Sequence, residues 1–150
     1  MLNIENLTNL TINIKLLEKI SKVLLNNHAS QEIDLTVCHN QTIQEYNRLY
    51  RGQDKATDVL SFPMENDIIV DNLSIMPLGS LVISADFVEE KATEFGHTNN
   101  DELSLLFIHG MLHLLGFDHE VDNGEMRKKE EEIIHKFHLP KSLIIRTEES

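Results

Sequence analysis

A chain of 150 residues with 41% hydrophobic residues is long enough to bury one sizeable core, and we expect residues 1–150 to form a single domain. The formal net charge of −12 disfavours non-specific binding to polyanions, because affinity for a phosphate backbone comes largely from Lys and Arg. Cys38 is the only cysteine, which excludes an intrachain disulfide and a cysteine-built zinc finger and fits a reducing compartment. No apolar run approaches the roughly 20 residues of a membrane span, so no membrane partner is expected.

The hydrophobic pattern of the first half of the chain predicts helices alternating with short strands. Apolar residues at helical spacing run through 13–27, and the alternation in EIDLTVCH predicts a half-buried strand over 32–39. Residues 41–51 are expected to be helical. A second strand is predicted over 57–63, where a proline stops it, and the following stretch, 64–77, is expected to be a loop or hairpin.

A third strand is predicted over 78–84, and the rest of the chain has the pattern of helices. Ser84 is expected to cap a helix that runs to Gly96. A second helix begins near residue 100 and ends at Gly116, and a third, rich in charge, covers 122–137. This order of elements predicts an α+β fold in which a small mixed sheet packs against several helices.

Three histidines occur at fixed intervals in HGMLHLLGFDH, residues 109–119. His109 and His113 are one helical turn apart, so their Cβ atoms lie about 5–6 Å apart on one face. Gly116 lets the chain turn back after the helix, which brings His119 toward the same point. Three neutral imidazoles with a fourth position open are typical of a catalytic zinc site. The sequence therefore predicts one Zn²⁺ per chain on this helix and the following turn, although nickel or copper would also bind such ligands tightly.

The spacing H-x3-H-x2-G-x2-H also occurs in the metzincin proteases. Those enzymes need Glu directly after the first His, because it takes a proton from the zinc-bound water. Gly110 occupies that position here, and no Met-turn signature is recognisable downstream. Gly110 therefore argues against peptide hydrolysis while leaving the metal site intact.

Residues 109–119 resemble throughout the signature H-G-x-L-H-L-x-G-[YF]-D-H of the YbeY family, bacterial single-strand-specific endoribonucleases also called rRNA maturation factors. NRLYRGQDKATDVLSFP, residues 47–63, is similar to the family block N-x-x-Y-R-x-x-D-x-x-T-[DN]-V-L-S-F-P, and EFGHT, residues 94–98, to its G-H-[ST]. The resemblance covers about residues 31–135. It has one departure, since Ser80 stands where the family usually has Asp.

The resemblance implies a zinc-dependent, single-strand-specific endoribonuclease that acts in rRNA processing (16S rRNA 3′-end maturation) and in ribosome quality control. Its expected partners are single-stranded RNA or rRNA and the ribosome or ribosomal proteins, and its expected location is the bacterial cytoplasm. The oligomeric state stays open. One alternative is a non-catalytic, metal-containing ribosome assembly factor, and a metalloprotease comes third.

The resemblance also assigns roles to basic residues. Arg51 becomes a candidate catalytic residue that clamps phosphate, because a planar guanidinium can bind two phosphate oxygens. Arg48 and Lys55 become candidate substrate-binding residues that contact the RNA backbone. His97, in the G-H-[ST] match, becomes a second catalytic candidate, as a proton relay or phosphate contact, whereas the residues alone favour a role at a helix end.

The remaining candidates support the site indirectly. Asp118 could hold a ligand imidazole in the correct tautomer or cap the turn. If the family's Asp at the position of Ser80 has a supporting role, Asp58 or Asp118 would have to supply it here. Gly110 could leave room for a substrate backbone near the metal or allow close helix packing, and both interpretations are open at this point.

Overall fold

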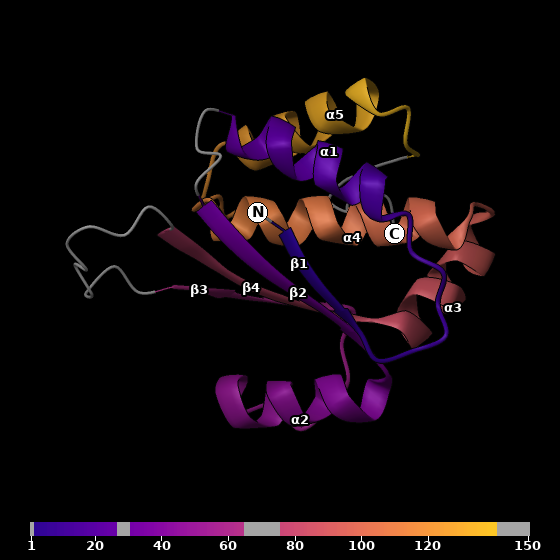
Figure 1. The fold of residues 1–150 in the computed structure, drawn as a ribbon. Coiled ribbons are helices and arrows are strands. Elements are labelled where there is room, and N and C mark those ends of the chain that lie inside the picture. The colour runs from indigo at the N-terminus through magenta and orange to yellow at the C-terminus, as the bar shows by residue number, and fades with distance from the viewer. Residues whose placement is uncertain (1, 27–30, 65–75, 141–150) are drawn as a thin grey trace.

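The computed structural model describes residues 2–26, 31–64 and 76–140, and a four-stranded mixed sheet lies at its centre (Figure 1). The strands are β1 (Leu2–Asn6), β2 (Gln31–Cys38), β3 (Val59–Pro63) and β4 (Met76–Ser84). Their spatial order is β1-β2-β4-β3. β1 and β4 run parallel to β2, whereas β3 runs antiparallel to β4 at the edge of the sheet.

Helices cover both faces of this sheet. In the described part of the chain they are α1 (Ile14–Leu25), α2 (Asn40–Arg51), α3 (Ala85–Phe95), α4 (Asn99–Leu114) and α5 (Glu125–Lys136). α2 covers one face; α4 packs on the other, with α1 and α5 beyond it and α3 beside its first turns (Figure 1). The predicted α+β fold, a small mixed sheet against several helices, is confirmed.

The central helix α4 approaches the sheet very closely at Gly110. A Cβ atom at this position would lie only 2.7 Å from Leu81 Cδ2 and 3.2 Å from Val59 Cγ2. The Ser61 hydroxyl donates to the Gly110 carbonyl at 3.1 Å, which ties α4 to β3. Of the two interpretations of Gly110, the structure supports close helix packing, because the side of Gly110 that lacks a side chain faces the sheet.

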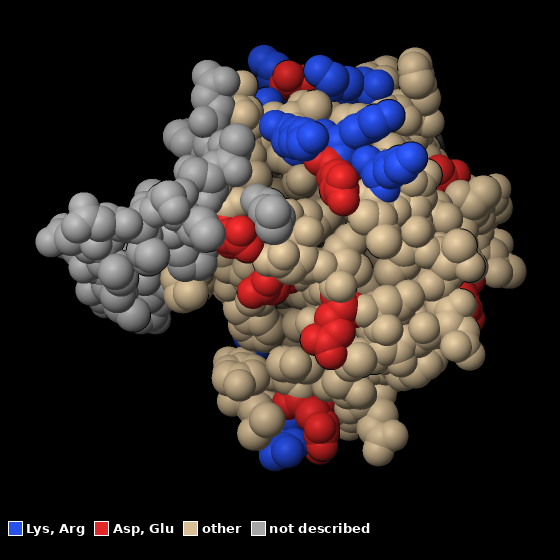
Figure 2. Space-filling view, in the orientation of Figure 1, with Lys and Arg blue, Asp and Glu red and all other residues tan. Residues whose placement is uncertain are grey.

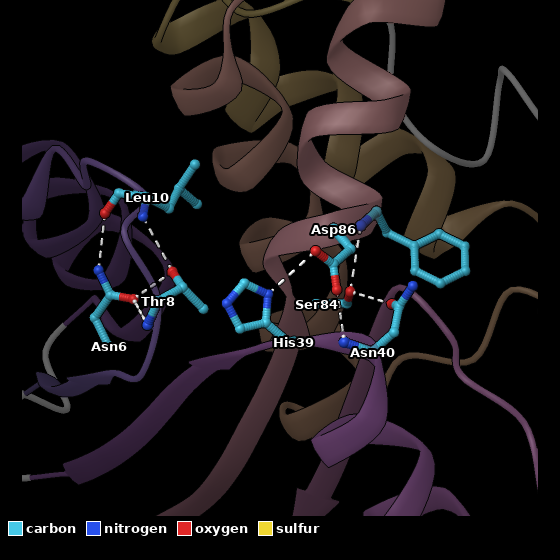
Figure 3. A network of polar contacts seen from close by, with 8 residues as sticks. Asn6, Thr8, Leu10, His39, Asn40, Ser84 and Asp86 are labelled. Atoms are coloured by element: carbon cyan, nitrogen blue, oxygen red, sulfur yellow. Dashed lines mark hydrogen bonds and ion pairs between the residues drawn. The ribbon is translucent and has the colours of Figure 1, made fainter.

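A polar network fixes the starts of α2 and α3 at the carboxyl ends of β2 and β4 (Figure 3). Ser84 caps α3 as predicted, since its Oγ accepts from the Phe87 amide, and its hydroxyl donates to Asn40 Oδ1 at 2.6 Å. Asp86 accepts from the Asn40 amide at 2.7 Å and lies 3.1 Å from His39 Nδ1. The hydrogen bond from the Asn40 amide, with a smaller contribution from His39, lowers the pKa of the Asp86 carboxyl.

The predicted elements match the observed ones except at the N-terminus, where β1 was not predicted. Most of the predicted loop over 64–77 lies outside the described residues, and β4 begins at Met76. Cys38 is fully buried in the core, and burial raises the pKa of its thiol to about 11. No helix within the described ranges is both long and apolar enough to cross a membrane.

The outer helices carry many of the chain's positive charges. Figure 2 shows Lys and Arg gathered over α1 and α5. On α5, Arg127 lies 3.4 Å from Glu131 and Lys129 lies 3.7 Å from Glu132, in pairs one helical turn apart. Exposed pairs of this kind contribute little to stability, so these residues form a solvated helix face.

Candidate metal centre

Two imidazoles converge at the end of α4. His109 Nε2 and His113 Nε2 lie 3.2 Å apart. Each ring is held from its other nitrogen, His109 Nδ1 by the Glu130 carboxylate and His113 Nδ1 by the Phe117 carbonyl, both at 3.1 Å. Because a carbonyl and a carboxylate accept hydrogen bonds, each Nδ1 carries the hydrogen. In the neutral rings both Nε2 lone pairs then point at each other, an arrangement that a cation between them stabilises.

The turn after α4 brings the third histidine to the same point. Gly116 has a positive φ of 98°, its amide donates to the His113 carbonyl, and the Phe117 amide donates to the Leu112 carbonyl. This pair of bonds is the Schellman motif that ends a helix and reverses the chain. The predicted role of Gly116 at the helix end is thus confirmed, and the reversed chain places the His119 ring 5.6 Å from His109, centroid to centroid.

The three histidines fit a metal ion. One ring nitrogen from each can be chosen so that all three lie within 4.8 Å of one another. The buried Nδ1 of His119 has no hydrogen-bond partner among the described residues, which is costly unless the nitrogen binds an ion or a water. Burial, and secondly the neighbouring His109, lower the pKa of His113 and so favour the neutral, metal-binding form of its ring.

Glu130 is a site residue that the sequence did not reveal. It comes from α5, is only 1% exposed, and its Oε2 lies 3.1 Å from His109 Nδ1. The residue stands in the charged run MRKKE, which looks like a solvated face. The available signal was its register, because Met126, Glu130, Ile133 and Ile134 fall on one buried stripe of the helix.

A cleft of about 530 Å³ opens beside the histidines, along the free edge of β3. It is lined by Arg51, Asp58, Val59, Leu60, Ser61, Pro63, His109, His113, Gly116, Phe117, Asp118 and His119. Arg51, at the end of α2, donates from Nη2 to the Ser61 carbonyl at 2.7 Å, and its guanidinium carbon lies 5.7 Å from the centre of the Phe62 ring. The structure therefore brings Arg51 and the three histidines to one cleft.

Three other predicted site residues lie elsewhere. The described residues that line the cleft do not include Arg48, Lys55 or His97. His97 Nε2 lies 2.8 Å from the buried carboxylate of Glu102, in the first turns of α4. Since Glu102 precedes His109 by seven residues, this pair is about 10 Å from the three-histidine cluster along the helix. The catalytic role of His97 stays a prediction.

The acidic candidates near the site have local hydrogen-bond partners. Asp58 and Asp118 both line the cleft. Asp118 Oδ1 accepts from the Glu120 amide at 3.0 Å, so it caps the turn, and the Phe117 carbonyl is what holds His113. Ser80 neighbours Leu81, which faces α4, and successive side chains of a strand point to opposite faces. A carboxylate at position 80 would therefore point away from the face of the sheet on which α4 and its histidines lie.

The chain is similar over nearly its whole length to known proteins. The sequence model described as "Endoribonuclease YbeY" matches residues 3–138. The chain is 54% identical over 148 residues to a protein named endoribonuclease YbeY from Sulfurovum sp. (strain NBC37-1), an alignment that covers 99% of this chain and 98% of the relative. It is 56% identical over 147 residues to the protein of that name from Aliarcobacter butzleri, covering 97% and 99% of the two chains.

A solved structure shares the fold. The solution structure of a Thermotoga maritima protein superposes with a TM-score of 0.59 at 30% sequence identity, and the match covers 92% of each chain. Together with the match of the sequence model over nearly the whole chain, these similarities show the family. The chain belongs to the YbeY family of endoribonucleases.

Proposed function

We propose that the protein is a zinc-dependent endoribonuclease that cleaves single-stranded RNA in rRNA processing. The observation that carries the proposal is the convergence of three imidazoles in a cleft that the Arg51 guanidinium also lines. The names of the relatives supply the reaction class, since they are endoribonucleases. The histidine ligands supply the choice of metal, because imidazole ligands with an open position are typical of catalytic zinc.

The residues of the cleft have complementary roles in this proposal. His109, His113 and His119 would hold the zinc ion, which when bound acts as a Lewis acid and lowers the pKa of a coordinated water to about 7. Arg51 binds the phosphate oxygens on which negative charge develops. Its guanidinium has five N–H donors, and the bond to the Ser61 carbonyl uses one of them. Arg51 is the only Lys or Arg among the described residues that line the cleft.

The strongly acidic chain sets a condition on the substrate. With a net charge of −12, binding to free RNA is expected to be weak and to weaken further as salt is added. RNA presented on a larger assembly needs less intrinsic affinity, so we propose rRNA on the bacterial ribosome, in the cytoplasm, as the physiological substrate. Arg48 and Lys55, both exposed outside the cleft, would contact more distant phosphates of the strand.

Peptide hydrolysis fits the cleft less well. The position after the first histidine is Gly110, which is packed against Leu81 and Val59. The buried Glu130 bonds the far nitrogen of His109, on the side of the ring away from the converging Nε2 atoms. Neither residue can act as the carboxylate base that a zinc protease requires.

The direct test compares a single-stranded RNA with the same strand in a duplex. The protein is assayed as purified, after removal of metal by a chelator, and after restoration with one equivalent of Zn²⁺. We expect cleavage of the single strand only, loss of cleavage with the metal, and recovery with zinc. Cleavage that persists after complete metal removal would contradict the proposal, and metal binding without any cleavage would favour the assembly-factor alternative.

A further inference from the structure

Three aromatic rings form a cluster at the end of α2 beside β3. The Tyr46 and Tyr50 rings stack, with centroids 6.1 Å apart and an interplanar angle of 25°. The ring of Phe62, on β3, lies edge-on to that of Tyr50, with centroids 5.5 Å apart. Its centroid lies 6.4 Å from that of Tyr46. Tyr46 and Tyr50 are the only tyrosines in the chain, and there is no tryptophan.

The outer ring of this cluster is open to solvent. Tyr50 is 67% exposed, and so are large parts of the apolar side chains of Leu49 (64%) and Met64 (50%). Tyr46 and Phe62 are partly buried, and the rings of both pack against the Tyr50 ring.

Arg51 joins this cluster to the cleft. Its guanidinium lies over the Phe62 ring and donates to the carbonyl of Ser61, which lines the cleft next to the histidines. Tyr50 immediately precedes Arg51 on α2. A nucleotide whose phosphate is bound by Arg51 would therefore have an aromatic surface within reach of its base.

We propose that Tyr50, backed by Tyr46 and Phe62, is a stacking subsite for one unpaired nucleobase of the RNA strand bound at Arg51. The inference rests on the proposed function and adds the substrate contact that makes it selective for single strands. Bases in a duplex are stacked on each other, whereas an unpaired base exposes a π-face to an aromatic side chain. The exposed Arg48, one turn before Arg51, adds positive charge for the same strand.

The test measures equilibrium binding of a fluorescein-labelled oligoadenylate of about eight nucleotides, checked by gel to remain intact during the measurement. Loss of one stacked base costs about 5- to 150-fold in affinity, and we expect Tyr50→Ala to weaken binding within this range. Tyr50→Phe should bind as the wild type does, because stacking needs the ring and not the hydroxyl group. Leu7→Ala, which removes a 53% exposed apolar side chain between β1 and α1, is the matched control and should also bind normally.

A second probe separates base stacking from phosphate binding. On a strand of the same length built from abasic nucleotides, Tyr50→Ala and the wild type should bind equally. The inference is overturned if Tyr50→Ala binds oligoadenylate as tightly as the wild type, if Tyr50→Phe is as weak as Tyr50→Ala, or if Tyr50→Ala weakens binding of both probes equally. In all three cases a wild type that still cleaves single-stranded RNA leaves the proposed function standing. A wild type that neither binds nor cleaves the RNA overturns both.

Discussion

Replacing Glu130 with alanine should weaken zinc binding by about 10- to 100-fold, which corresponds to roughly 1.4–2.7 kcal/mol. The Glu130 carboxylate lies 3.1 Å from His109 Nδ1 and is 1% exposed, so water does not readily replace it. This contact keeps the hydrogen on Nδ1 and the lone pair on the Nε2 atom that faces His113. Without the carboxylate, the His109 ring can adopt its other tautomer and other orientations. Zinc binding must then select the one competent form, which lowers the affinity.

The assay is competition for Zn²⁺ against a chromogenic chelator, with circular dichroism as a check on the fold. Glu130→Gln keeps an acceptor oxygen but loses the charge, so its affinity should lie between those of the wild type and Glu130→Ala. Glu131→Ala is the matched control, because the side chain of this neighbour is 43% exposed and paired with Arg127 at 3.4 Å, so its loss should leave zinc affinity unchanged. A folded Glu130→Ala protein with wild-type zinc affinity would refute the reasoning.

Three further predictions concern packing, catalysis and pH. Gly110→Ala should lower the free energy of unfolding, measured in urea, by about 1–2 kcal/mol, because overpacking against Leu81 outweighs the gain in helix propensity, and unchanged stability would contradict this. Arg51→Lys should lower kcat for single-stranded RNA by about 100-fold at saturating substrate, since a planar donor pair is lost, and a wild-type kcat would exclude a phosphate contact in the transition state. The pKa of Asp86 is lowered in the folded state, so its contribution to stability is complete above the unfolded value of about 3.9 and is lost as the pH falls through the folded value. Asp86→Asn keeps an oxygen for the Asn40 amide but cannot be protonated in this range, so the free energy of unfolding, measured in urea, should fall less steeply below about pH 4 than in the wild type. An unchanged pH dependence would argue against this bond.

The cluster of three histidines could be predicted from the sequence because its geometry is local. His109 and His113 are fixed relative to each other by one helical turn, and Gly116 sets the reversal that returns His119. No contact between distant segments is needed to bring the three rings together. The same locality explains why Ser84 could be identified as a helix cap.

Features that depend on distant segments were missed or left open. β1 has only Leu2 and Ile4 as alternating apolar residues, and it becomes a strand through parallel pairing with β2, about 30 residues along the chain. Glu130 reaches His109 across the packing of α5 on α4, which the charged sequence of α5 conceals. The packing role of Gly110 depends on which side chains of the sheet face it.

The basic residues show that a sequence motif does not determine which of its side chains reach the cleft. Arg48, Arg51 and Lys55 all lie in the block that resembles the family, but only Arg51 lines the cleft in the described structure. Arg51 is the last residue of α2, and its bond to the Ser61 carbonyl turns the guanidinium around the free edge of β3. A sequence pattern gives the residue types of such a block, whereas the direction of each side chain depends on how α2 packs against the sheet.

The central claim is that the histidine site is the catalytic centre, and paired measurements of metal content and RNA cleavage on His113→Ala test it most directly. His135→Ala, which removes an exposed histidine of α5, is the control. The account predicts one zinc ion per chain in the wild type and the control, and loss of both the ion and single-strand cleavage in His113→Ala. Cleavage that survives the loss of the ion would contradict it.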